Sequence, residues 1–260
     1  MHRMWRALGI LAAGLAVAAA QDSKPGPQAC GGVDQPGGTV QGIVKFTGKK
    51  PKRAPVAEVA GNAFCKECHK EELPLHERWV FGKNGEQDTV QNVLVHVTGG
   101  LEGRSFEPPK TPVVVDQVRC VYTPHVVGVM AGQTLEIRNS DGTLHNVMCN
   151  PRNNKGFNEG MSVKGGKLEK VFANPEFKLD LRCFMHPWML AYAHVMKHPY
   201  YAVTGPDGSF AIKGLPPGEY EVSILHETSR MIPEPASVKV KVEAGQTRKL
   251  DFTYRFGEEE

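Results

Sequence analysis

This sequence of 260 residues has few long apolar runs, and it has no strong net charge of either sign. After the first 20 residues, no segment is long and apolar enough to span a membrane as a helix. The formal net charge is only +3 and the basic residues are scattered, which argues against nucleic acid or an anionic membrane surface as a partner. No Ser-His-Asp order, paired-carboxylate pocket or phosphate-binding loop is readable, so we do not expect an enzyme.

The N-terminal segment has the pattern of a secretory signal peptide. A basic start (MHRMWR) precedes an apolar run that ends at Ala20, with small residues at the positions before a cleavage point. We therefore predict a signal peptide over residues 1–20, a flexible leader over residues 21–38, and a periplasmic or secreted protein with no membrane span after cleavage. The alternative is a retained N-terminal anchor.

Many short valine-rich runs are interrupted by the 28 glycines and 19 prolines of the sequence, which is typical of sandwiches and barrels. Seven such runs follow one another between residues 113 and 196: VVVDQ, HVVGVMAG, TLEIRNSD, HNVMC, KLEKVF, FKLDLRCF and YAHVM. That density predicts an all-β fold with a small two-sheet sandwich in this part of the chain.

The main candidate site combines two of these runs. Cys183, His186 and Met189 occur as Cys-x2-His-x2-Met after a predicted strand, and His145 follows NSDGTL after another. Thiolate and thioether suit Cu(I), whereas imidazole suits both oxidation states, so these four side chains form the ligand set of a blue copper site. The alternatives are a buried free thiol with packed neighbours, or a sandwich that has lost its metal.

The segments NSDGTLHNV and CFMHPWM resemble the ligand loops of cupredoxins, and the short second loop is most similar to those of amicyanin- and plastocyanin-like proteins. The resemblance covers residues 113–197 and implies a cupredoxin-like Greek-key sandwich. It implies that His145, Cys183 and His186 are equatorial ligands and that Met189 is the axial ligand. It also implies that Asn146 joins the two ligand loops by hydrogen bonds.

The same resemblance implies how electrons would enter. Cupredoxins commonly pass electrons through the exposed edge of the second histidine, so Pro187 and Trp188 would lie at the docking surface of a redox partner. A compatible alternative role for Trp188 is to cover the site and keep water out. Cys149 lies four residues after His145, where it could compete for the metal or form a disulfide. The loop that begins at Cys183 holds a single cysteine, so we expect one mononuclear copper.

The segment CKECH matches the attachment pattern of c-type haem. In that interpretation Cys65 and Cys68 would bond to the haem and His69 would ligate the iron. Other interpretations stay open: free thiols, a disulfide either within the pair or from one of them to Cys120, and a zinc site with His69 and His76. Only about 40 residues separate the flanking strands, which is short for a haem domain.

The two ends of the chain share a second resemblance. The segments GTVQGIVKFTGKKP, VQNVLVHV and VTGPDGSFAIKGLPPGEYEVSI resemble the carboxypeptidase regulatory-like family, a small transthyretin-like β-sandwich. This implies a sandwich split into residues 39–98 and 200–256, with the cupredoxin-like domain inserted as residues 106–199. Three consecutive pieces are the alternative. Exported proteins of this architecture carry the label methylamine utilisation protein, which implies a dehydrogenase partner that nothing in the chain identifies.

Together these patterns predict an exported type 1 copper protein that transfers one electron at a time to a redox partner. The alternatives are a non-redox module that binds copper or carbohydrate at the cell surface, and a two-centre carrier with copper and haem c.

Overall fold

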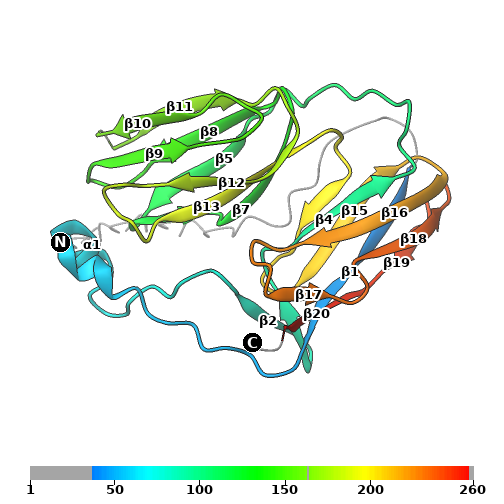
Figure 1. Cartoon of the computed structure of the whole chain (residues 1–260), viewed down its shortest axis with the longest axis horizontal. Coiled ribbons are helices and arrows are strands. Elements are labelled where there is room, and N and C mark those ends of the chain that lie inside the picture. Colours follow the sequence, from blue (N-terminus) through cyan, green and yellow to red (C-terminus); the bar gives the residue numbers. More distant parts are fainter. Residues whose placement is uncertain (1–36, 163, 258–260) are drawn as a thin grey trace, which may run out of the picture.

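The computed structural model describes residues 37–162 and 164–257, and the statements below concern these residues. The predicted signal peptide, nearly all of the leader and Cys30 lie outside them. The described chain is almost entirely β-structure, with twenty strands, one 3-10 helix and one short α-helix. Its strands form two sandwiches that lie side by side, which confirms the predicted all-β fold class (Figure 1). Among the described helices, neither has the length and hydropathy needed to cross a membrane.

The first sandwich consists of two facing sheets built from residues 113–196. One sheet has the order β11-β8-β5-β6 and contains β5 (Val113–Val118), β6 (Val121–Thr123), β8 (Thr134–Asn139) and β11 (Gly166–Val171). The other has the order β10-β9-β12-β13-β7 and contains β7 (Val126–Met130), β9 (His145–Cys149), β10 (Phe157–Met161), β12 (Glu176–Arg182) and β13 (Leu190–Met196). Each of the seven predicted runs contains one strand, and β6 and β10 are additional.

Alternation of apolar side chains explains why these segments form a sandwich. In β5 the residues Val113, Val115 and Gln117 are buried and their neighbours are partly exposed, as expected for a strand with one face on a core. Residues from both sheets meet in one apolar cluster that includes Leu135, Val147 and Leu181. The strand β7 departs from this alternation because all of its residues are buried, so both of its faces are covered.

The second sandwich is formed by strands from both ends of the described chain. Its larger sheet contains β1 (Gly38–Thr47), β2 (Phe81–Asn84), β3 (Gln87–Val90), β15 (Ser209–Leu215), β17 (Met231–Pro233), β19 (Thr247–Lys249) and β20 (Phe252–Phe256). Its smaller sheet has the order β14-β4-β16-β18 and contains β4 (Leu94–Gly99), β14 (Tyr201–Val203), β16 (Gly218–Leu225) and β18 (Ser237–Val242). Because β4 lies between β14 and β16, strands that precede and follow the first sandwich share one sheet.

The segment VQNVLVHV contains a break between two strands, since β3 ends at Val90 and β4 begins at Leu94. Asn92 between them has a φ of 64°, in the left-handed region, which interrupts the extended backbone at this point.

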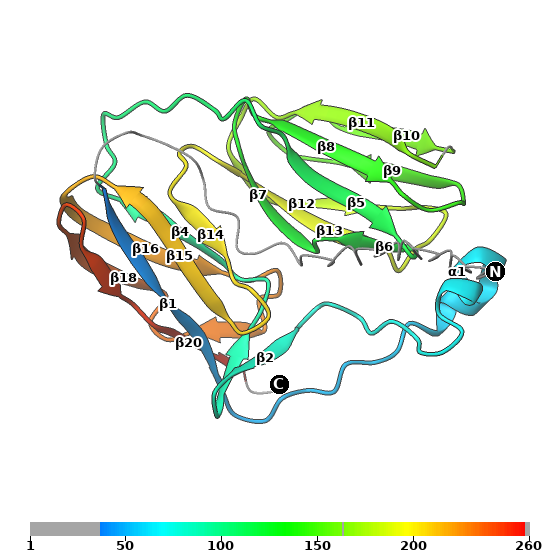
Figure 2. The same ribbon diagram turned by 180° about the vertical axis from the view of Figure 1, so that it is seen from behind.

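Residues 48–80, between β1 and β2, form a segment that we call the strap. It leaves the second sandwich, runs to the far end of the first, and returns (Figures 1 and 2). The strap contains the 3-10 helix η1 (Ala57–Gly61) and the helix α1 (Ala63–Cys68). A disulfide between Cys65 and Cys120 ties α1 to the turn between β5 and β6.

The contact between the two sandwiches gives a first testable prediction. Gly128 on β7 faces the ring of Tyr201 on β14, and a Cβ at position 128 would lie 2.2 Å from that ring. We predict that Gly128→Ala lowers the free energy of unfolding by about 1–3 kcal/mol, as overpacking of a buried contact does. Urea-induced unfolding measures this change.

Gly160 on β10 provides the matched control, because a Cβ there meets no atom within 4 Å. We expect Gly160→Ala to change the free energy of unfolding by no more than about 0.5 kcal/mol. Equal unfolding midpoints for the two variants would contradict the described packing of β7 against β14.

Candidate metal centre

Three of the four predicted ligands converge at one end of the first sandwich. The Nδ1 atoms of His145 and His186 are 2.9 Å apart, and the sulfur of Cys183 lies 3.9 Å and 3.6 Å from them, respectively. The three residues are at most 2% exposed. One thiol and two imidazole nitrogens that face one another in a buried site have the donor chemistry that a soft or borderline metal ion requires.

Strand pairing brings these side chains together. His145 begins β9, and Cys183 directly follows β12, which is the neighbour of β9 in the sheet. The pairing of Met148 with Arg182 places the ends of both strands side by side. The ligand loops therefore meet although 38 residues separate His145 from Cys183.

Met189 closes the loop that follows β12. Its backbone N–H donates to the carbonyl of His186 at 2.8 Å, and its own carbonyl accepts from the backbone N–H of Cys183 at 3.3 Å. The side chain is only 1% exposed and belongs to the core of the first sandwich. Cys183, His186 and Met189 therefore lie on one tight turn, and the role of Met189 as axial ligand stays a prediction.

Asn146 lies between the two ligand loops. Its Oδ1 atom accepts from the backbone N–H of Phe184 at 2.6 Å and of Met185 at 3.4 Å. Its own backbone N–H donates to the sulfur of Cys183 at 3.5 Å. This side chain thus links the β9 loop to the β12 loop, which is the position that the cupredoxin resemblance implied for it.

Asp141 is a site residue that the sequence did not reveal. Its carboxylate accepts from Nε2 of His145 at 2.9 Å and from the backbone N–H groups of Arg119 and Cys120 at 2.5 Å and 2.8 Å. The contact to Nε2 turns Nδ1 of His145 toward the other ligands, as partners of metal-binding histidines do. The sequence feature that could have indicated this role is the position of Asp141, four residues before His145 in NSDGTLH. The same sequence is also typical of an ordinary turn, so it does not distinguish a site residue.

Hydrogen bonds determine the charge of this cluster. Burial alone would raise the pKa of Cys183, but hydrogen bonds from His145, His186 and the backbone N–H of Asn146 lower it to about 6. Burial would likewise lower the pKa of His145, but its hydrogen bonds to Asp141 and Cys183 raise it. Cys183 is therefore a thiolate at neutral pH, the form in which cysteine binds metals.

The predicted haem alternative at CKECH is wrong. The sulfur of Cys65 is bonded to that of Cys120, so only Cys68 of the two required thiols is free. Nε2 of His69 is 2.6 Å from the carbonyl oxygen of Arg119. The disulfide to Cys120, one of the alternatives considered above, is the arrangement that the structure contains, and it also removes the zinc alternative.

Cys149 does not take part in the metal centre. It is 1% exposed, and burial raises the pKa of its thiol to about 12. Among the residues that the structure describes, it belongs to none of the three clusters of potential metal ligands. Its predicted competition for the metal therefore finds no support, and it is an inert core cysteine.

The predicted exposed edge of His186 is also wrong, because the strap covers it. His186 is 1% exposed, and Nδ2 of Asn62 lies 3.1 Å from its Nε2 atom. The indole of Trp188 packs beside it at 5.1 Å between ring centroids and donates to the carbonyl of Cys120 at 2.9 Å. The exposed side chains in the ligand loop are Phe184, Met185 and Pro187, the last of which was expected at the docking surface.

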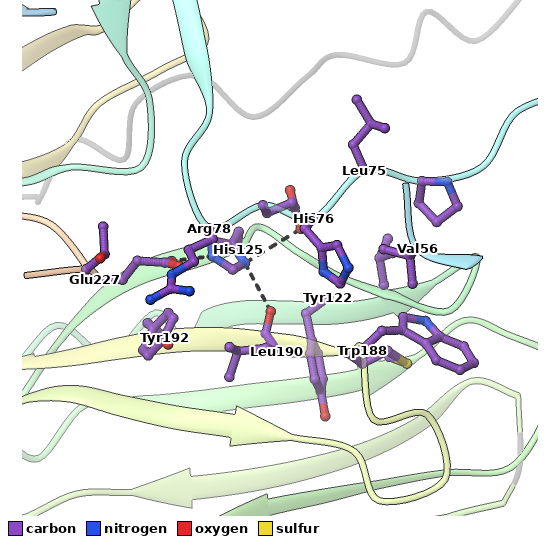
Figure 3. Close-up of a pocket in the computed structure, with 15 residues that line it drawn as sticks. Val56, Leu75, His76, Arg78, Tyr122, His125, Trp188, Leu190, Tyr192 and Glu227 are labelled. Carbon is purple, nitrogen blue, oxygen red and sulfur yellow. Dashed lines mark hydrogen bonds and ion pairs between the residues drawn. The ribbon is translucent and has the colours of Figure 1, made fainter. Parts of the chain in front are cut away.

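A cavity of about 310 Å³ lies on the other side of Trp188, between the strap, the ligand loop and the second sandwich. Figure 3 shows His125 in its wall, with contacts to both sandwiches. Its Nε2 atom is 2.5 Å from a carboxylate oxygen of Glu227, and its Nδ1 atom is 3.0 Å from the carbonyl oxygen of Leu190. Both ring nitrogens are thereby occupied, and His125 joins the second sandwich to β13.

Comparisons with known proteins find similarity only to solved structures. No protein-family model and no curated protein matches the chain. Among solved structures it is similar to a Cu-containing nitrite reductase from Thermus scotoductus SA-01, with 21% identity and a TM-score of 0.31 over 39% of this chain and 25% of that one. It is also similar to a purple cupredoxin from Nitrosopumilus maritimus, with 22% identity and a TM-score of 0.28 over 32% of this chain and 99% of that one.

A mutant of amicyanin in its Cu(I) state is a further similar structure, with 20% identity and a TM-score of 0.31 over 38% of this chain and 97% of that one. The chain thus spans a quarter of the nitrite reductase and nearly all of the two small cupredoxins. The carboxypeptidase regulatory-like resemblance of the second sandwich has no counterpart in these comparisons and stays an expectation.

The low pKa of Cys183 leads to the second prediction. In protein prepared without metal, we expect a thiolate absorbance transition with a midpoint at about pH 6. His145→Leu should move this midpoint upward, because it removes the contact with the imidazole that lowers the pKa of Cys183. The folded-state pKa lies below that of an unfolded cysteine, so the associated stabilisation is complete at alkaline pH and is lost as the pH falls through about 6.

An ultraviolet pH titration measures the transition, and Cys183→Ser identifies the signal by removing it. Cys149 supplies an internal contrast, since its thiol stays protonated in this range. A midpoint at the ordinary value for cysteine would contradict the described hydrogen bonds to the sulfur.

Proposed function

We propose that this chain is an exported type 1 copper protein that carries single electrons. The observation that supports this most strongly is the buried convergence of the His145 and His186 Nδ1 atoms on the sulfur of Cys183. A thiolate with two imidazoles is the equatorial donor set of blue copper sites, and the nearby Met189 would add a weak axial thioether. Copper, when bound, would supply one-electron oxidation and reduction.

The chain's own residues favour electron transfer by keeping the ligands in place. Asp141 holds the His145 ring, and Asn146 ties the backbone after Cys183 to β9. Side chains fixed by such partners need little rearrangement when the charge of the site changes, which favours fast transfer. The low pKa of Cys183 keeps the thiolate available without a separate base.

We propose a carrier rather than an enzyme. Burial of His145, Cys183 and His186 leaves little room for a substrate to reach the ligand atoms, and the strap covers the ring edge of His186. A redox partner protein belongs to this proposal, and Phe184, Met185 and Pro187 are the exposed side chains of the ligand loop that it would meet.

Export and the second sandwich complete the proposal. Export rests on the signal peptide predicted for residues 1–20, and an oxidising compartment agrees with the disulfide between Cys65 and Cys120. The second sandwich, with its carboxypeptidase regulatory-like sequence pattern, would serve as the scaffold that carries the strap.

Visible absorption of the purified chain after addition of Cu(II) tests this function. We predict an intense band from the thiolate–copper bond that disappears on reduction. Cys183→Ser should abolish the band completely, because it removes the thiolate. Cys149→Ser is the matched control and should keep the band, since Cys149 lies outside the ligand cluster.

An unchanged spectrum in Cys183→Ser would overturn the assignment of the thiolate ligand. A colourless wild-type protein that nevertheless binds Cu(I) tightly would favour copper storage or delivery over electron transfer.

A further inference from the structure

The strap contacts the proposed metal centre through the side chain of Asn62. Asn62 is the N-cap of α1, and its Oδ1 atom accepts from the backbone N–H of Cys65 at 3.1 Å. A backbone N–H can only donate, so the amide atom that faces it must be the oxygen. The nitrogen, Nδ2, therefore faces Nε2 of His186 at 3.1 Å.

This orientation determines which nitrogen of His186 carries the proton. An amide nitrogen has only hydrogens to offer, so Nε2 of His186 accepts in this contact. A neutral imidazole has one N–H, which then lies on Nδ1, the atom that faces His145 and Cys183. A metal ion that binds through Nδ1 needs the opposite tautomer, with the proton on Nε2.

With the proton on Nε2, two N–H groups would face each other across the contact between Asn62 and His186. The strap cannot simply slide away, because a disulfide joins α1 to Cys120 and the carbonyl oxygen of Cys68 accepts from the guanidinium of Arg119 at 2.5 Å. The conflict is relieved when Asn62 turns its oxygen toward His186, and the N–H of Cys65 then loses its cap.

We infer that Asn62 is a positioning residue that couples the strap to metal binding, because α1 and metal-bound His186 compete for its one amide oxygen. The inference rests on the proposed function and deepens it. It gives the strap a role beyond covering the site: its first helical turn responds to whether His186 holds a metal.

Asn62→Asp is the informative variant. A carboxylate has two acceptor oxygens, so one can cap the N–H of Cys65 while the other accepts from Nε2–H of His186. We expect this variant to bind Cu(II) about tenfold more tightly than wild type in competition with a chelator, the size of effect that partners of metal ligands commonly have.

Ala63→Asp is the matched control for the added charge. Position 63 is exposed and lies next to Asn62, outside the contact with His186. The same gain in affinity for both variants would mean that the negative charge, and not the hydrogen bond, is responsible, and this would overturn the inference.

Nitrogen NMR of histidine-labelled protein tests the same contact without copper. At mildly alkaline pH, wild-type His186 should carry its proton on Nδ1, and Asn62→Asp should shift it to Nε2, whereas Ala63→Asp should not. A proton on Nε2 in the wild type would overturn the inference even if copper binds. A failure to bind copper would sink the proposed function but leave this measurement valid.

Discussion

The proposed metal centre depends on β9 and β12 being antiparallel neighbours in one sheet. Their pairing at Met148 and Arg182 brings His145, at the start of one strand, to Cys183, just beyond the end of the other. Asn146 then fastens the two loops through the backbone N–H of Phe184. A slip of one residue in this register would turn every side chain of the strand to the opposite face and would separate the ligands.

The strap makes this chain differ from a bare sandwich with a ligand loop. It starts and ends in the second sandwich, yet its helix is bonded to Cys120 and contacts His186. The two sandwiches are therefore linked at the metal centre as well as where β7 packs on β14. With His186 covered, Phe184, Met185 and Pro187 are the exposed side chains of the ligand loop, and the redox partner that we propose would meet the chain there.

The sequence was most informative for features that depend on residues close together in the chain. Short valine-rich runs predicted the seven strands, and the spacing of Cys183, His186 and Met189 predicted a loop that brings three side chains together. The contributions of Asn62 and Asp141 could not be predicted in this way. Asn62 reaches His186 across 124 residues, and nothing in its local sequence distinguishes it from any other helix cap.

The same limit explains the incorrect alternative at CKECH. Two cysteines two residues apart, followed by histidine, are a haem pattern locally, but Cys65 is bonded to a cysteine 55 residues away. The expected exposure of His186 failed for a related reason. That expectation came from the resemblance to cupredoxins, which concerns residues 113–197. The strap lies outside that range of the chain, so the resemblance could not predict that it covers His186.

The most direct test of the central claim is X-ray absorption at the copper edge of the copper-loaded protein. The account predicts one copper with a single short bond to sulfur and two to imidazole nitrogen, and loss of the short sulfur bond in Cys183→Ser. A copper surrounded only by nitrogen and oxygen in the wild type would show that the convergence of His145, Cys183 and His186 is not the metal site.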